Sequence, residues 1–472
     1  MIFPTYSEFK ALAKKGNLIP VVREIPADLD TPVSAFLKLG KAEYGFMFES
    51  VEGGEKWGRY SFVGVNPAHV IRMMEQKDYL SELENLMKSY KPVVLPDLPR
   101  FYGGLVGYLS YDVVNSFEKI PQKEKEATPF PYAIFLLTST LLIFDNLRQV
   151  IQVVSNVYLD PKKSLQAQYE KAVRKNNGIV TKLKSGLKSS SKKISIKNEL
   201  KASLNENQFC NLVEKVKKYI EAGDVFQTVI SLRYTGKTNI APFDLYRVLR
   251  RLNPSPYMYY LKLGDMDIVG ASPEVMVRLD EGKVELRPIA GTRRRGKTEE
   301  EDNELEKELQ SDPKEMAEHV MLVDLGRNDL GRVCQMGSVK VDEQAIVERY
   351  SHVMHLVSHV SGKIHKGKNA FDVIRATFPA GTLTGAPKIR AMEIIEELEP
   401  LRRGPYGGCV GYIGFSGNTD MAITIRTAII KNKTIFIQAG AGIVYNSEPR
   451  LEYKECQNKA MALVKALESF EL

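Results

Sequence analysis

Two pairs of acidic residues have a spacing that could bind a metal ion. Glu315 and Glu318 are three positions apart in the chain, and so are Glu452 and Glu455. Residues three apart lie on one face of a helix, so two such helices facing each other would present carboxylates to a hard cation such as Mg²⁺. The same spacing recurs in other acidic stretches, where it is typical of a solvated helix face. Spacing alone therefore leaves a metal site and a solvated surface both open.

Helix start signals precede both acidic pairs. Asp312 is a suitable N-cap, and Pro313 suits the first helical position. Glu315 is placed for a capping box, and Gly326 predicts the end of this helix. Pro449 opens the second predicted helix. We therefore expect both acidic pairs to lie near the starts of helices.

A third pattern could bind phosphate. Residues 291–298 match the P-loop pattern GxxxxGK[ST], between a predicted strand and a predicted helix. The acidic residues 299–302 would fill the first turn of that helix and repel an anion. A P-loop NTPase is therefore an alternative that the surrounding residues disfavour.

Glycine-rich loops at residues 378–388, 403–412 and 438–443 would let backbone amides approach an anionic ligand closely. Arg426 stands in the apolar run 422–430, which predicts a single buried strand. A buried guanidinium needs a carboxylate partner, and a structural ion pair is the simplest one. His355 lies on another strand-like run, where a lone histidine is more often structural than catalytic.

The whole chain has the composition of an ordinary globular protein. It has 472 residues, of which 43% are hydrophobic, enough for two or three domains or one large two-lobed unit. Most of its net charge of +8 comes from residues 181–201, which hold seven Lys and one Glu. This local basicity favours a solvated linker, and nucleic-acid binding through it remains the second alternative.

Cysteine usage and hydropathy indicate a cytoplasmic protein. The four cysteines show no CxxC pair, which argues against disulfides and a zinc site. No signal peptide is read at the N-terminus, and the longest apolar run, residues 132–144, is too short to cross a membrane. We expect neither a membrane nor a nucleic acid among the partners.

Short β-rich runs punctuated by Gly and Pro predict a strand-rich α+β region over residues 1–180, with a hairpin at residues 145–148. The Lys/Ser-rich residues 181–204 predict a linker, and residues 205–472 a second region. That second region begins with a predicted helix at 205–222.

From residue 205 onward, the chain resembles the chorismate-utilising enzymes, with five motifs in the order found in that family. These motifs are Gly270–Glu274, Pro288–Thr292, Glu318–Asp329, Gly381–Pro387 and Ala439–Ile443. Residues 20–36 and 49–61 resemble the large subunit (component I) of anthranilate synthases. The resemblance implies an α/β/α sandwich with extended antiparallel sheets and an active-site cleft between the layers. It also implies a regulatory or partner-binding role for residues 1–180 and a catalytic one for residues 205–472.

The resemblance also implies roles for individual residues. The Mg²⁺ ligands would be Glu318 and Glu455, supported by Glu315 and Glu452; the substrate-binding residues would be Gly291, Thr292, Tyr406, Arg426, Gly440, Ala441 and Gly442; and the catalytic residues would be Glu274, His355 and Thr382. Glu274 would act as the general acid on the departing 4-hydroxyl of chorismate. His355 and Thr382 would assist the later loss of a ring proton and of pyruvate.

Two positions discriminate among the family's products. Enzymes that add water carry a lysine base where this chain has Gln227, and aminodeoxychorismate enzymes carry a nucleophilic lysine where it has Ala290. The resemblance therefore implies that ammonia adds at ring C2 and that anthranilate is formed, the first committed step of tryptophan biosynthesis. Aminodeoxychorismate synthase component I, of the 4-aminobenzoate and folate pathway, is the alternative.

The family resemblance implies two further ligands. We recognise no Cys-His-Glu glutaminase region, so we expect a separate glutamine amidotransferase subunit (component II) to supply ammonia. A feedback site for L-tryptophan would comprise Glu49, Ser50, Pro256, Tyr257, Met258, Val410 and Tyr412. Residues 47 and 48 depart from the usual leucines of the family at this site.

Overall fold

The computed structural model describes residues 1–40, 42–50, 58–75, 77–125, 128–187, 200–350 and 353–470. Residues 188–199 of the predicted linker, 51–57 of an N-terminal motif and 351–352 of the run before His355 lie outside the described residues. In the described part, strands and helices mix as the α+β prediction requires, and every strand pair is antiparallel.

The first sheet has thirteen strands and runs through both halves of the chain. Its order is β1 (Ile2–Phe3), β2 (Leu18–Pro26), β9 (Val150–Tyr158), β8 (Thr140–Asp145), β4 (Tyr60–Val65), β3 (Tyr44–Glu49), β12 (Tyr257–Leu263), β13 (Met266–Ser272), β22 (Thr427–Lys431), β23 (Thr434–Ile443), β11 (Gln227–Lys237) and β10 (Lys201–Ala202), with β19 (Gly385–Ala386) beside β11. The predicted hairpin at residues 145–148 is confirmed, because β8 and β9 pair on either side of it.

The second sheet has ten strands. Its order is β16 (Ile289–Arg294), β18 (Val353–Lys363), β15 (Lys283–Leu286), β14 (Val275–Asp280), β21 (Thr419–Ile423), β20 (Cys409–Gly414), β6 (Gly104–Leu109), β7 (Ala133–Thr138) and β5 (His69–Met73), with β17 (Lys340–Arg349) beside β18. Pairing of β3 with β12 and of β6 with β20 joins residues before and after the predicted linker. The predicted boundary at 181–204 therefore separates two stretches of chain that share both sheets.

The two sheets pack against each other, and helices cover their outer faces. One buried cluster contains side chains of both sheets, for example Phe62 and Tyr259 of the first with Tyr108 and Val410 of the second. Burying apolar side chains of both sheets in one layer holds the sheets face to face. The predicted α/β/α sandwich thus has a double-sheet β layer.

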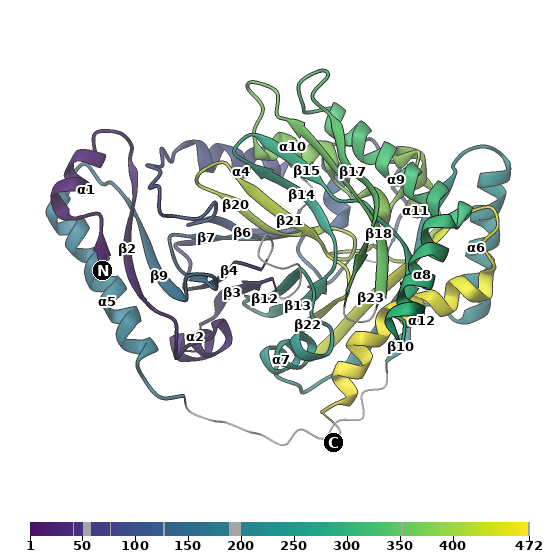
Figure 1. Cartoon of the computed structure of the whole chain (residues 1–472), viewed down its shortest axis with the longest axis horizontal. Coiled ribbons are helices and arrows are strands. Elements are labelled where there is room, and N and C mark those ends of the chain that lie inside the picture. Colours follow the sequence, from purple (N-terminus) through teal and green to yellow (C-terminus); the bar gives the residue numbers. More distant parts are fainter. Residues whose placement is uncertain are drawn as a thin grey trace.

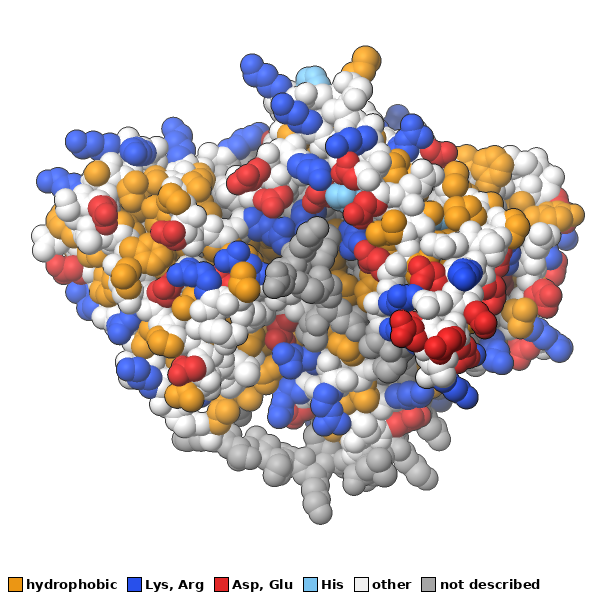
Figure 2. Space-filling model, viewed as in Figure 1, with side chains coloured by type: hydrophobic (Ala, Val, Ile, Leu, Met, Phe, Trp, Pro, Cys, Tyr) orange, Lys and Arg blue, Asp and Glu red, His pale blue; other side chains and the backbone are white. Residues whose placement is uncertain are grey.

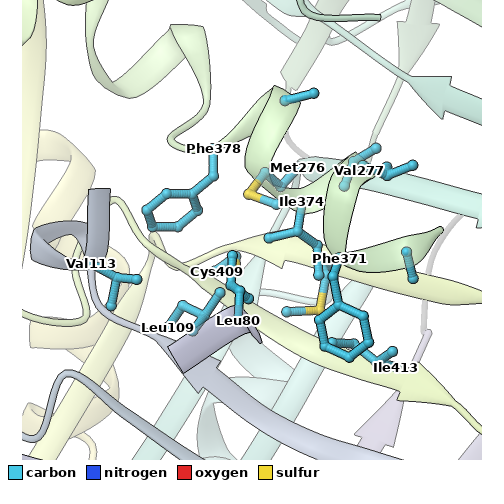
Figure 3. Close-up of a cluster of buried hydrophobic side chains, with 14 of the residues drawn as sticks. Leu80, Leu109, Val113, Met276, Val277, Phe371, Ile374, Phe378, Cys409 and Ile413 are labelled. Carbon is cyan, nitrogen blue, oxygen red and sulfur yellow. The ribbon is translucent and has the colours of Figure 1, made fainter. Parts of the chain in front are cut away.

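Separate clusters fix the outer helices. On the first sheet these are α2 (Pro32–Leu39), α5 (Leu165–Leu183), α7 (Pro242–Leu252) and α12 (Pro449–Glu468), with α6 (Glu206–Glu221) and α11 (Lys388–Leu398) near β11. On the second sheet they are α4 (Tyr79–Lys88), α9 (Pro313–Gly331) and α10 (Ala370–Thr377), and Figure 3 shows Leu80 of α4 and Phe371 and Ile374 of α10 against Met276, Cys409 and Ile413 of this sheet.

The remaining helices are α1 (Tyr6–Leu12), α8 (Glu299–Ser311), and the 3₁₀ turns η1 (Tyr111–Ser116) and η2 (Gly381–Leu383). α1 and α5 lie at one end of the molecule, and α6, α8 and α12 lie at the other (Figure 1). The predicted helix at 205–222 is confirmed as α6, which Asn205 caps. Among the helices of the described residues, none has the length and apolar character needed to cross a lipid bilayer.

One sequence prediction about strands is wrong. The apolar run 422–430 is not a single strand, because β21 in the second sheet ends at Ile423 and β22 in the first begins at Thr427. The apolar run 133–144 divides in the same way at Ser139, between β7 and β8. The pattern of apolar residues in the sequence indicates that a segment is buried but not which sheet buries it. A bend of one to three residues between strands of different sheets therefore leaves no signal in the sequence.

The prediction for the end of α9 is also wrong. The helix continues past Gly326 to Gly331. Gly326 is buried against the second sheet, where a Cβ atom would make ordinary van der Waals contact, 3.4 Å from Leu286 Cδ1, and its helical backbone does not end the helix. Asp312 does cap α9, but Glu315 binds Arg293 instead of completing a capping box.

Candidate active site

Glu274 lies where the chain leaves the first sheet and enters the second. β13 ends at Ser272 and β14 begins at Val275, so Glu274 occupies the short crossing between them. Its carboxyl is buried and accepts a hydrogen bond of 3.0 Å from Thr382 Oγ1. Desolvation of the charged form raises the pKa of Glu274 to about 8, against smaller opposing effects of Thr382 and Lys459. At neutral pH, Glu274 therefore holds a proton that it can donate.

Arg426 occupies a second crossing between the sheets. It follows β21 and precedes β22, and its backbone adopts φ of 50°. Burial lowers the pKa of its guanidinium, while Glu455 and Tyr406 oppose this shift. The expected structural ion pair is absent: among the described residues, no carboxylate lies within ion-pair distance of Arg426. A desolvated guanidinium with no internal carboxylate is suited to binding an anionic ligand.

The glycines of β23 leave space for two polar side chains. A Cβ at Gly440 would lie 2.7 Å from Tyr406 Oη, and one at Gly442 would lie 2.6 Å from Gln227 Nε2. Ala441 between them is fully buried. Only glycine therefore lets Tyr406 and Gln227 lie directly against this strand.

The four predicted metal ligands come from α9 and α12. Gln227 Nε2 donates a 2.9 Å hydrogen bond to Glu318 Oε1. Burial raises the pKa of Glu318, and the negative charges of Glu315 and Glu455 raise it further. Burial also raises the pKa of Glu452, again with a contribution from Glu455. The two acidic pairs thus share one electrostatic environment.

These acids do not form a ready-made metal centre. Within the described ranges, no group of three or more His, Cys, Asp or Glu side chains is arranged to hold a metal ion. Arg293 pairs with Glu315, and Lys459 is a second cation beside the acids: its Nζ lies 2.6 Å from Glu455 Oε1 and donates to the Gly440 carbonyl at 3.0 Å. The desolvated carboxyls of Glu318 and Glu452, with Glu315 and Glu455 beside them, form an oxygen donor set that fits Mg²⁺, because a divalent cation would relieve their repulsion.

Lys459 is the site residue that our sequence reasoning missed. It lies four positions after Glu455 in α12, a spacing at which oppositely charged side chains meet on a helix. That spacing was visible in the sequence, but it is also the commonest arrangement of a solvent-exposed ion pair.

Gly291 and His355 form the other side of the site. Gly291 has φ of 62°, and a Cβ there would lie 3.2 Å from Glu315 Oε2. His355 Nδ1 lies 2.9 Å from the Gly291 carbonyl oxygen and 3.1 Å from Thr292 Oγ1. Because a carbonyl only accepts, Nδ1 carries the proton of the neutral ring, which leaves Nε2 as an acceptor. Burial lowers the pKa of His355 and favours this neutral form.

Shared neighbours connect these groups into one site. The charge of Lys459 acts on both Glu274 and Glu318. Glu455 acts on Arg426, and Arg426 in turn acts on His355. The structure therefore brings together, from several strands and helices and from the crossings between the sheets, the residues that the sequence placed in one site.

A separate cavity of about 560 Å³ contains all seven residues of the predicted tryptophan site in its lining. At one wall, Tyr257 Oη donates to Asp420 Oδ1 at 2.8 Å, and Arg278 Nε donates to Asp420 Oδ2 at 3.0 Å. The hydroxyls of Tyr102 and Tyr412, both of which line the cavity, have no hydrogen-bond partner in the described part of the chain. Both hydroxyl oxygens are buried away from the cavity surface, so the polar groups on this wall are those of Asp420 and Arg278.

The P-loop alternative fails on the structure of its loop. Gly296 N donates to Asp302 Oδ1 at 2.7 Å, and Lys297 N donates to Glu301 Oε2 at 2.6 Å. The backbone amides that would bind a phosphate in a P-loop thus already donate hydrogen bonds to carboxylates of α8. Figure 2 shows Asp and Glu side chains gathered over this helix, which would repel a nucleotide.

Comparisons with known proteins agree with one another. Residues 46–465 match the model of the chorismate binding enzyme family. The anthranilate synthase component 1 of Acetivibrio thermocellus is 47% identical over 99% of both chains, and that of Aquifex aeolicus is 48% identical over 98% of this chain and 97% of the relative.

Solved structures show the same likeness. The crystal structure of anthranilate synthase component I from Streptococcus pneumoniae is 35% identical and superposes with a TM-score of 0.79 over 93% of this chain and 98% of that one. A menaquinone-specific isochorismate synthase from Escherichia coli has a TM-score of 0.75 over 98% of this chain and 99% of that one, at 19% identity, and supports the fold alone.

Proposed function

Because the chain belongs to the chorismate-binding enzymes, and within them to the anthranilate synthase component 1 family, we propose that it converts chorismate and ammonia to anthranilate, pyruvate and water. One observation carries the proposal. Glu274, protonated at neutral pH, shares a site with Arg426, a buried guanidinium that has no carboxylate partner among the described residues. A proton donor beside a dianion-binding site is what the elimination of a hydroxyl from chorismate requires.

Chorismate carries two carboxylates, and the site has two places for them. Arg426, Tyr406 and the amide of Gly442 would bind the enolpyruvyl carboxylate. The amides near Gly291 and Thr292 would face the ring carboxylate, beside the acids of α9. Binding both ends of the substrate would fix the ring between Glu274 and His355.

Two of the proton transfers in this reaction can be assigned to residues, while the added ammonia also loses a proton and the departing enolpyruvyl group gains one to become pyruvate. Glu274 would protonate the 4-hydroxyl, which leaves as water while ammonia adds at ring C2. Neutral His355 would then accept the C2 proton through Nε2 as the enolpyruvyl group leaves as pyruvate and the ring becomes aromatic. Thr382, which donates to Glu274, would hold this carboxyl in position.

A Mg²⁺ ion fits the acidic side of the site. Glu318 and Glu455 would bind it, supported by Glu315 and Glu452, and it would neutralise the ring carboxylate of chorismate. The Gln227 amide donates a hydrogen bond to Glu318 Oε1 and is not a base that could activate water. The apolar side chain of Ala290 offers no covalent nucleophile. Ammonia is therefore the nucleophile that these residues favour.

Two further ligands belong to the proposal. Since its relatives are named component 1, the chain would receive ammonia from a glutamine amidotransferase subunit, component II. L-tryptophan would bind in the 560 Å³ cavity as a feedback inhibitor, which its apolar walls and ion pairs favour.

The proposal is tested with the purified chain, chorismate, Mg²⁺ and ammonium. We expect anthranilate, followed by its fluorescence, and pyruvate, followed by lactate dehydrogenase, in equal amounts. Accumulation of 4-amino-4-deoxychorismate instead would contradict the proposal and support the aminodeoxychorismate alternative.

A further inference from the structure

A tyrosine of the large cavity reaches the segment that carries Arg426. Tyr259 of β12 lines the cavity and is opposite Gly270 of β13, which is itself opposite Thr427 of β22. A Cβ at Gly270 would lie 2.1 Å from the Tyr259 ring, so the glycine lets this ring lie across β13. The Tyr259 hydroxyl consequently lies 2.6 Å from Thr427 Oγ1, two strands away.

The direction of these hydrogen bonds can be assigned. Thr427 Oγ1 donates to the carbonyl of Ile425 at 2.7 Å. A hydroxyl has a single proton, so the Tyr259 hydroxyl must be the donor to Thr427. The chain of bonds therefore runs from Tyr259 through Thr427 to Ile425, and its last bond spans Arg426.

The spanned residue has a backbone conformation that needs support. Arg426 has φ of 50°, in the left-handed region that non-glycine residues seldom adopt. Such a residue persists where its surroundings fix it. The bond from Thr427 to Ile425 spans Arg426, and the bond of 3.1 Å from Ala271 N to the Arg426 carbonyl holds its peptide against β13.

We propose that Tyr259 is a positioning residue for Arg426 and that it couples the cavity to substrate binding. The proposal rests on the proposed function, in which Arg426 binds a carboxylate of chorismate and the cavity binds tryptophan. A tyrosine ring is rigid and here is buried, so a ligand that displaces its cavity side also moves its hydroxyl. Loss of the bond from Tyr259 then frees the Thr427 hydroxyl from the position in which it donates to Ile425, and this loosens the Arg426 bend and weakens chorismate binding. By linkage, bound chorismate weakens tryptophan binding by the same factor.

The experiment compares four variants of the full chain with wild type, using ammonium and Mg²⁺. Tyr259→Phe and Thr427→Val each break the chain of bonds, while Thr427→Ser keeps the hydroxyl. Tyr260→Phe is the matched control, since it removes a hydroxyl from the same strand but on the outer face, where that hydroxyl binds Asp267. Thermal melting confirms that each variant folds. The readouts are KM for chorismate, kcat, and KM again in saturating tryptophan.

We expect Tyr259→Phe and Thr427→Val to raise KM for chorismate about fivefold, with kcat changed less than about twofold. The factor by which saturating tryptophan raises KM should be at least about fivefold smaller in these two variants than in wild type. Thr427→Ser and Tyr260→Phe should behave as wild type. Wild-type KM and wild-type tryptophan sensitivity in Tyr259→Phe would overturn the proposal, as would a Thr427→Ser variant that behaves like Thr427→Val.

These outcomes are distinct from failure of the proposed function. A wild-type chain that forms no anthranilate would overturn the proposed activity. An active wild-type chain that does not bind tryptophan by calorimetry would overturn the coupling role of Tyr259, while the KM values of Tyr259→Phe and Thr427→Ser would still decide its positioning role.

Discussion

The crossings that carry Glu274 and Arg426 are hydrogen-bonded to each other's strands. Ile423 N donates to the Glu274 carbonyl at 3.0 Å, and Ala271 N donates to the Arg426 carbonyl at 3.1 Å. The two crossings are therefore antiparallel neighbours, and both place a functional side chain at the same transition between sheets. Backbone bonds rather than loop contacts fix the proton donor relative to the anion-binding group, which favours a preorganised site.

We predict that Glu274→Gln abolishes proton donation but not substrate binding. An amide keeps the size of the side chain and cannot protonate the leaving hydroxyl, so kcat should fall by about 10² to 10⁴. Chorismate affinity, measured by calorimetry with Mg²⁺, should change little. Glu281→Gln, at the exposed turn after β14, is the control for the loss of a carboxylate. Turnover near the wild-type rate would exclude Glu274 as the acid.

We predict that activity falls as the pH rises through about 8, because Glu274 must be protonated to donate and its pKa lies near that value. The measurement is kcat/KM from about pH 6 to about pH 10, because the pH dependence of this ratio reports the pKa of the acid in the ligand-free enzyme. An alkaline limb near the usual pKa of a glutamic acid, with no loss around 8, would contradict the assignment.

Protein stability gives an independent check on this pKa. The folded-state pKa of Glu274 is raised, so its contribution to stability is complete below the ordinary glutamic acid pKa and is lost as the pH rises through about 8. Glu274→Gln has no proton to lose. The Tm of Glu274→Gln minus the Tm of wild type should therefore increase as the pH rises from the ordinary glutamic acid pKa to about 8. A Tm difference that stays constant over this range would count against a raised pKa.

We predict that Glu318→Gln and Glu455→Gln each lose Mg²⁺-dependent turnover while remaining folded. Each substitution removes a charged oxygen from a helix that does not need it to form, and relieves repulsion between the acids. Mg²⁺ titration of activity and thermal melting measure the two effects. Glu304→Gln is the matched control, because Glu304 has the same three-residue spacing from Glu301 but lies on α8, outside the acidic pairs of α9 and α12. Full activity in either site variant would remove it from the metal site.

We predict that L-tryptophan inhibits the enzyme by binding in the 560 Å³ cavity, whose lining contains all seven residues of the predicted tryptophan site. The measurement is anthranilate formation at increasing tryptophan concentration. Equal activity with and without tryptophan in the millimolar range would exclude the site.

We predict that ammonium alone supports turnover by this chain, whereas glutamine supports it only after a component II amidotransferase is added. The ammonia source is tested by following anthranilate formation with each nitrogen donor, before and after addition of that subunit. Glutamine-driven turnover by the purified chain alone would contradict the proposed partner.

The sequence by itself determined the local features of this site. The helix cap at Asp312, the helix starts near Asn205 and Pro449 and the acidic spacing at Glu315 and Glu318 all depend on a few neighbouring residues, and the structure has them where the sequence predicted. The motifs that resemble the family could be read in the same way, because each is a short continuous segment.

Only the tertiary structure decided how these segments meet. It showed that the run around Arg426 crosses between sheets, that its guanidinium lacks the expected carboxylate among the described residues, and that Gln227 binds Glu318. It also placed Tyr259 across Gly270 onto Thr427. These relationships depend on which strands pair and in which register. Strand pairing joins residues that lie far apart in the chain, so the residues near one strand do not indicate which strand will pair with it.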